Sequence, residues 1–191
     1  MLFHPKKART LTIGIALALP AAVVCAPPPA QRAIPPDAVM LKAPTSSLHI
    51  AHRPAVRATF KDWVVLNARH EVTSGIVERV TLLAADGSKA TFAGEVDFGD
   101  TGLVSWGVLA MNSSLRAPGP EKRMLPLKAG TFAYFLPGSK EVPGGVLKGV
   151  LSAPMRFTTT KGETVEIPAG DAILLDAQGQ LVDWRPAEDN E

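Results

Sequence analysis

Residues Gly162–Trp184 read GETVEIPAGDAILLDAQGQLVDW and contain three short runs of apolar, β-favouring residues. Pro168-Ala169-Gly170 separates the first two runs, and Gln178-Gly179 separates the second from the third. A residue before proline is held extended, and glycine reaches the positive φ that a tight turn needs. The stretch therefore predicts strand, corner, strand, turn and strand. Its core candidates are Ile167, Ile173, Leu175 and Leu181.

A partial copy of this pattern lies about forty residues earlier, in Leu125–Leu136, which reads LPLKAGTFAYFL. Ala129-Gly130 repeats the corner and the residues after it repeat the apolar strand, whereas the proline has moved to Pro126. Two interpretations are open. The segments are two independent β-corners, or they are products of an internal duplication.

From Arg57 onward the chain also consists of short β-type runs separated by turn residues. Lys89–Phe98 alternates apolar and polar residues, which is typical of a half-buried strand, and Asp86-Gly87 predicts the hairpin turn before it. No long window shows an apolar stripe at helical spacing. Further strands are predicted at Phe60–Leu66, Ile76–Leu83, Leu103–Ala110, Thr131–Leu136, Val146–Leu151, Met155–Thr160, Thr164–Ile167, Ala172–Leu175 and Leu181–Trp184.

These patterns predict an all-β fold, namely an antiparallel sandwich or small barrel of roughly 8–10 short strands. The 191 residues, of which 46% are hydrophobic, suffice for one well-buried domain. The predicted organisation is an export signal or N-terminal anchor at 1–26, a Pro-rich linker at 27–56, the β-domain at 57–186 and a polar tail at 187–191.

The first 26 residues combine a basic start with an apolar run, Leu11–Ala26, that Pro20 interrupts. The run is shorter than the roughly 20 residues of a membrane span, and this pattern is typical of an export signal. An uncleaved N-terminal anchor is the alternative. We therefore expect an extracytoplasmic protein, whether periplasmic, outer-membrane-associated or secreted, that meets a membrane only through this segment.

Cys25 is the only cysteine, so an intramolecular disulfide is impossible. It lies where a lipoprotein carries its lipid, which makes Cys25 a candidate lipidation site. The preceding Ala22-Val23-Val24 departs from the lipobox pattern, because leucine is missing three positions before the cysteine. The alternative is that Cys25 belongs to the apolar run and leaves with it.

The proline content of the linker and the charge balance of the domain each indicate a property. The linker holds seven prolines, which predicts an extended spacer in which Ala38–Leu41 could dock as an edge strand. From Arg57 onward, 14 Lys and Arg stand against 17 Asp and Glu, a net charge of −3. A basic stripe of the kind that binds nucleic acid is therefore not expected.

Two families resemble the last sixty or so residues. Gly162–Ala172 resembles the second half of a cupin barrel, which implies a fold only, because no histidine follows His70 to hold a cupin metal. Ala129-Gly130-Thr131, Pro143-Gly144-Gly145 and Ile167–Gly170 are similar to the periplasmic barrel component of type IV secretion channels. That resemblance implies an assembly role; neither assigns a site residue.

Signatures of catalysis and of cofactor binding are missing. Ser105 lacks the glycine spacing of a nucleophile elbow and no histidine follows it. Glu95, Asp97 and Asp100 form the densest acidic cluster; it could bridge a hard cation or be a solvated acidic face, and the second interpretation is favoured. We predict no catalytic residue, cofactor or metal.

Trp63, Trp106 and Trp184 are spread over the domain. Such aromatic residues could line a carbohydrate- or peptide-binding face, but core anchors are the favoured interpretation, with Trp184 as the expected exception. The sequence thus favours an exported, envelope-associated β-domain that binds or assembles with an envelope protein or polymer. The alternatives are a component of a secretion or conjugation channel with a periplasmic β-barrel domain, and a hydrolase whose carboxylate site assembles from distant strands.

Overall fold

The computed structural model describes residues 39–138 and 144–186, all within one compact unit, Ile34–Glu191. The predicted signal with Cys25, the linker before residue 39 and the tail at 187–191 lie outside the described residues. Within the described ranges the chain forms strands and no helix, which confirms the all-β class.

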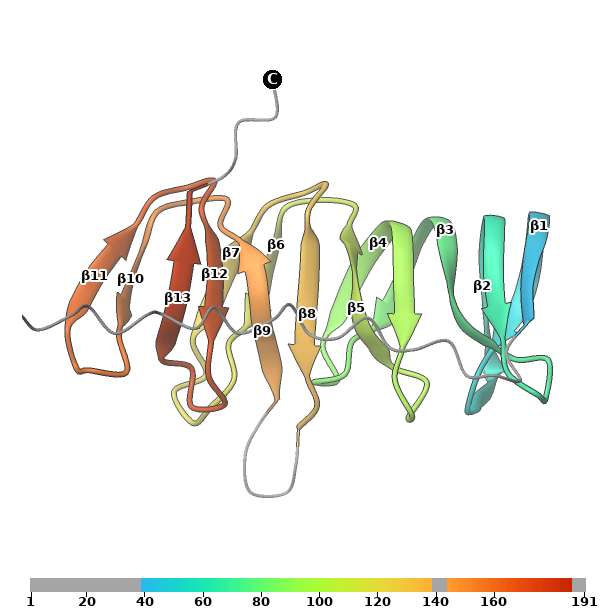
Figure 1. The fold of residues 1–191 in the computed structure, drawn as a ribbon, viewed down its shortest axis with the longest axis horizontal. Coiled ribbons are helices and arrows are strands. Elements are labelled where there is room, and N and C mark those ends of the chain that lie inside the picture. Colours follow the sequence, from blue (N-terminus) through green and yellow to red (C-terminus); the bar gives the residue numbers. More distant parts are fainter. Residues whose placement is uncertain (1–38, 139–143, 187–191) are drawn as a thin grey trace, which may run out of the picture. The chain divides into compact units, whose positions relative to one another are not determined.

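Thirteen strands are described, against roughly 8–10 expected from turn signals. Nine of them form one sheet in the order β1-β2-β3-β4-β5-β8-β9-β12-β13, and β6-β7 and β10-β11 form two smaller sheets (Figure 1). The strands are β1 (Val39–Ile50), β2 (Arg53–Leu66), β3 (Val72–Leu83), β4 (Lys89–Phe98), β5 (Val104–Leu109), β6 (Ser113–Arg116), β7 (Met124–Leu127), β8 (Phe132–Leu136), β9 (Gly145–Val150), β10 (Met155–Thr158), β11 (Thr164–Ile167), β12 (Ala172–Leu175) and β13 (Leu181–Arg185).

Neighbouring strands in the nine-stranded sheet are antiparallel, as the short connections predict. One parallel pairing, between Ile50 of β1 and Val72 of β3, makes the sheet mixed. Ile50 also pairs with Arg53 of β2, and the next residue, Ala51, donates its N–H to Val72 O at 2.9 Å, so the turn end of the β1–β2 hairpin contacts the start of β3.

Five of the hairpin turns share one geometry. In the turn after β12, the Asp176 N–H donates to Gln180 O (2.9 Å), and the Gly179 N–H donates to Asp176 O (3.1 Å). The fourth residue has positive φ, which glycine supplies in four of the turns. The same bonds close the turns that start at Asn67, Ala84, Gly99 and Thr159.

The paired Ala-Gly segments occupy equivalent corners. The Gly130 N–H donates to Leu109 O, and the Gly170 N–H donates to Leu151 O, both at 2.8 Å. The Leu109 N–H donates to Thr131 O, and the Leu151 N–H donates to Asp171 O, both at 3.0 Å, so in each corner the residue after the glycine accepts the return bond. The partial sequence copy therefore corresponds to a repeated unit, in which the chain leaves the main sheet, forms a hairpin and returns.

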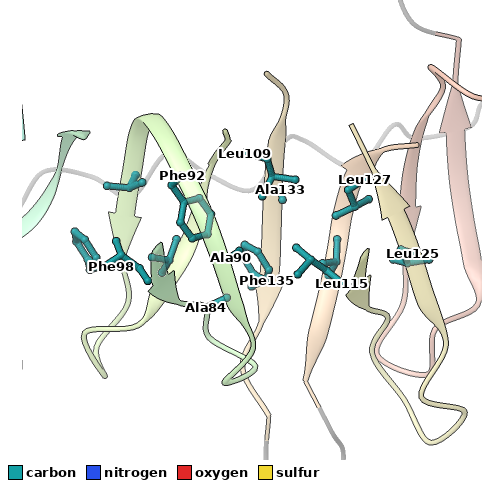
Figure 2. Packing of buried hydrophobic residues seen from close by; sticks show 14 of the residues in the cluster. Ala84, Ala90, Phe92, Phe98, Leu109, Leu115, Leu125, Leu127, Ala133 and Phe135 are labelled. Carbon is teal, nitrogen blue, oxygen red and sulfur yellow. The ribbon is translucent and has the colours of Figure 1, made fainter. Parts of the chain in front are cut away.

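The core is one cluster that includes side chains from the main sheet and from both smaller sheets. Figure 2 shows part of it, with Phe92 and Phe98 of the main sheet and Leu115 and Leu125 of the β6–β7 sheet. Its largest members are phenylalanines, and edge-on ring pairs join Phe60 to Phe98 and Phe92 to Phe135 at centroid distances of 6.4 and 6.2 Å. The four core candidates of the opening stretch are confirmed, each with at most 2% of its surface exposed: Ile167, Ile173, Leu175 and Leu181.

The sheet begins before Arg57, the predicted start of the β-domain, and its first strand includes most of the candidate edge strand Ala38–Leu41. Residues 39–56, assigned to the linker, form β1 and the start of β2, and the apolar Val39–Leu41 pairs with Val64–Leu66. Pro44 falls at a register shift between Ala43 and Ser46, where the strand ladder is interrupted, so a proline is tolerated there.

Candidate functional site

Three aromatic side chains meet on the face of the main sheet that points away from the core. Trp106 of β5 pairs across the sheet with Tyr134 of β8. Its ring stacks on Tyr134 at a centroid distance of 5.9 Å and tilts against Phe132 at 5.4 Å. Trp106 and Tyr134 are half-buried and Phe132 is 42% exposed, so solvent reaches this aromatic cluster.

Strand alternation directs these rings outward. In β8 the buried residues are Ala133 and Phe135, which leaves Phe132 and Tyr134 on the opposite face. In β5 a register shift separates the buried Val104 from Trp106, and the buried Gly107 and Leu109 that follow leave Trp106 on that opposite face as well. The cluster is therefore fixed by the same alternation that fills the core.

A charged residue lies at each end of the cluster. The register aligns Asp97 with Trp106, Trp106 with Tyr134, and Tyr134 with Lys148 across β4, β5, β8 and β9. The Lys148 Nζ atom lies 5.5 Å from the centroid of the Tyr134 ring, within cation–π range. The outer face thus presents a row of carboxylate, indole, phenol and ammonium.

The environment of Tyr134 alters its acidity. Partial burial raises the pKa of the Tyr134 phenol above its ordinary value of 10.0, and the negative charge of Glu95 raises it further. Tyr134 therefore stays neutral at physiological pH and keeps its O–H donor. A neutral phenol suits hydrogen bonding to a hydroxyl-bearing ligand.

The predicted acidic cluster spans strand β4 and the turn that follows it. Glu95 and Asp97 share the outer face of β4, whereas Asp100 lies in the turn between β4 and β5. The Ser105 Oγ atom donates to Asp97 Oδ2 at 2.5 Å, which holds this carboxylate beside the aromatic cluster. In the part of the chain that the structure describes, no three His, Cys, Asp or Glu residues gather closely enough to hold a metal ion.

The interpretation of Trp63 and Trp106 as core anchors is wrong. Both are half-buried, and the structure buries phenylalanines instead. Around Trp106 both strand faces carry apolar residues, so alternation alone could not show which face is buried. Trp184 is 44% exposed, as expected.

Exposed apolar residues also lie on both edge strands of the main sheet. On β1 they are Val39, Met40 and Leu41, with Met40 57% exposed, and on β13 they are Val182 and Trp184. An edge strand with unpaired backbone groups can accept a strand from another chain. The edges are therefore a second candidate surface, separate from the aromatic cluster.

No protein-family model, curated protein or solved structure matches the chain. Across residues 39–138 and 144–186, no helix is long and apolar enough to cross a membrane.

Proposed function

We propose that this chain is an exported, envelope-associated β-domain that binds an envelope polymer through the aromatic cluster. The observation that carries the proposal is the solvent-facing contact of Trp106 with Phe132 and Tyr134 on a sheet whose other face is the core. Aromatic rings exposed on a rigid strand surface offer apolar faces to a ligand, and a few polar groups beside them fix its orientation.

A glycan polymer suits this surface better than a strongly charged ligand. Sugar rings have C–H faces that stack on aromatic rings and hydroxyls that bond to polar groups. Asp97 accepts, Lys148 donates and the neutral Tyr134 does both. Opposite charges at the two ends of the row do not favour a ligand of one sign.

Co-sedimentation of the full-length chain with insoluble cell-wall glycan tests this function. Trp106→Ala should weaken binding about tenfold, equivalent to about 1.4 kcal/mol of lost ring contact. Trp184→Ala is the matched control, because it removes an exposed tryptophan at the sheet edge, and it should bind like the unaltered chain. Equal binding by both variants, with folding checked by circular dichroism, would exclude the cluster as the binding face.

Assembly is the second candidate function, and the exposed apolar residues of the edge strand β1 favour it. In this case a strand of a neighbouring envelope protein pairs with β1, as in a channel or secretion assembly. Replacing Met40 with Lys introduces a charge that discourages edge pairing, so it should abolish assembly and leave glycan binding intact.

We also propose a sandwich in which β6-β7 and β10-β11 form the second layer over the main sheet. Support comes from the smaller sheets, whose Leu115, Leu125 and Phe157 belong to the same buried cluster as main-sheet residues.

The proposal that the protein is exported rests on the leader sequence, residues 1–26. Intact-mass measurement of an extracytoplasmic fraction should find a chain that lacks the first two dozen or so residues, and a full-length cytoplasmic species would contradict it.

The hydrolase alternative has the least support. Glu95 and Asp97 lie on one strand, Asp97 is held by Ser105, and the exposed His70 lies in the turn between β2 and β3. A catalytic pair needs groups positioned across a bound substrate.

A further inference from the structure

Trp184 lies on the core side of the main sheet, in the strand at its edge. It pairs with Ile173 of β12, which in turn pairs with Gly149 of β9. Residues paired in this way point to the same face of a sheet. Gly149 and Ile173 are buried, whereas Trp184 is 44% exposed. This row of core-facing residues is therefore covered as far as β12 and open at β13.

The backbone and side chains of β13 are accessible along this edge. In the described part of the chain, β13 pairs with β12, and its one further bridge is at its first residue, where the Thr160 N–H donates to Leu181 O at 3.3 Å. All residues of β13 after Leu181 are exposed, with Val182 at 52%. An edge strand of this kind can pair with a strand of another chain.

The order of side chains in β13 is complementary to itself. Trp184 stands between Asp183 and Arg185, whose side chains share the other face of the strand and are 50% and 64% exposed. In an antiparallel pair of two β13 strands centred on Trp184, each Asp183 lies opposite the Arg185 of the other copy, and the two indoles lie opposite each other. Opposite charges and aromatic pairs at such positions stabilise a strand pair. A parallel pair in register would instead place like charges opposite each other.

The strand at the other edge of the main sheet lacks this complementarity. In β1 the exposed Val39, Met40 and Leu41 precede Lys42, and the strand holds no acidic residue. Two β1 strands would therefore bring together basic charge without an acidic counterpart. A second copy of the chain suits β13 better than β1.

We propose that two copies of this chain associate through β13, in an antiparallel two-fold pair centred on Trp184 that joins their main sheets. The same strand is used by both copies, as a two-fold interface requires. The pairing uses neither the aromatic cluster nor β1, so it depends neither on glycan binding nor on assembly through β1.

The contact is small, which sets its strength. Four exposed residues from each copy cover much less than the roughly 800 Å² per partner of a standard stable interface, so the dimer should be weak, with a Kd of about 0.1 mM or higher. The glycan test, at low protein concentration and sparse coverage of the glycan, stays below this range. Trp184→Ala therefore remains a control there.

Sedimentation equilibrium of the full-length chain, from about 10 μM to about 1 mM, measures the dimer on both sides of the expected Kd. Asp183→Arg and Arg185→Asp each place like charges opposite each other in both halves of the symmetric pair, so each should weaken dimerisation at least about tenfold. Glu78→Arg is the matched control. It makes the same charge change as Asp183→Arg on an exposed residue of β3, and it should leave the Kd unchanged.

Mixing the two charge variants tests the antiparallel register itself. A chain with Asp183→Arg and a chain with Arg185→Asp place opposite charges across both halves of a mixed pair, so the mixture should dimerise about as well as the unaltered chain. The double variant, in which the two charges are exchanged within one chain, should also dimerise with itself. Circular dichroism checks the fold of each variant, and the double variant provides the test if a single one does not fold.

Four outcomes would overturn the proposal. The first is a chain that stays monomeric over the whole concentration range. The second is a mixture that dimerises no better than either charge variant alone, and the third is an equal loss in Glu78→Arg, which would mean that net charge alone controls association. The fourth is loss of the dimer in Met40→Lys with no effect of the charge variants, which would place the contact at β1.

Discussion

The ring of Phe92 occupies the space that a side chain at Gly107 would need. A Cβ at Gly107 would lie 2.9 Å from Phe92 Cδ1 and 3.0 Å from Val96 Cγ1. Gly107 thus allows β4 and β5 to pair closely on the core side, and its neighbour Trp106 then points to the opposite face. A core contact therefore fixes the position of the aromatic cluster.

Gly107→Ala should destabilise the protein by about 1–3 kcal/mol, the usual cost of overpacking a core. Urea denaturation of the full-length chain measures the change. In a Phe92→Leu background the cost of the same substitution should shrink, because the smaller side chain frees space. If the losses in free energy of unfolding caused by the two substitutions simply add in the double variant, the contact between Gly107 and Phe92 is contradicted.

Tyr134 is the only tyrosine in the chain, so the tyrosinate absorbance reports on this residue alone. Because burial and Glu95 raise its pKa, the absorbance should titrate with a midpoint above 10.0, and Glu95→Gln should lower that midpoint. Between the unfolded and folded pKa values the folded state binds more protons, so stability should fall as pH rises above about 10. A midpoint unchanged by Glu95→Gln would contradict the charge effect.

Asp176 stabilises the turn after β12 with its side chain, because Oδ1 accepts from the Gln178 N–H at 3.0 Å and from the Gln180 N–H at 2.8 Å. Asp176→Ala should lower the free energy of unfolding by about 1–2 kcal/mol. Asp183→Ala provides the comparison, since it removes only an exposed ion pair with Arg185 and should cost about 0.5 kcal/mol or less. Thermal unfolding distinguishes the two, and equal losses would argue against the turn effect.

Limited proteolysis should separate the Pro-rich segment from the domain. The pairing of β1 with β2 moves the expected start of the resistant fragment from Arg57 to about Val39. N-terminal sequencing of the fragment locates the cut. A fragment that begins near Arg57 would mean that β1 opens readily from the sheet.

Much of the strand pattern was predictable because its signals are local. The predicted bounds of Lys89–Phe98, Thr164–Ile167 and Ala172–Leu175 agree with β4, β11 and β12, where alternation is regular or a turn follows directly. Gly94 has φ 103°, and register shifts to both neighbouring strands fall beside it, yet the alternation of β4 continues past it.

The features that could not be predicted from the sequence depend on contacts between residues distant in the chain. β6 and β7 carry few β-branched residues, and Pro126 lies within β7, so neither strand has a local signal. The sequence could not show which face of β8 is buried, because Phe132 and Tyr134 alternate with Ala133 and Phe135, which are apolar too.

The repeated units also imply an order of assembly. The hairpin β6–β7 lies between β5 and β8 in the chain, and β10–β11 lies between β9 and β12, so each outer pair encloses a shorter inner one. Once the inner hairpin has formed, only the two corners remain to be closed before the outer strands meet, which keeps the loop entropy of each step small. A chain released segment by segment could therefore fold from the inside of each unit outward, without waiting for its other end.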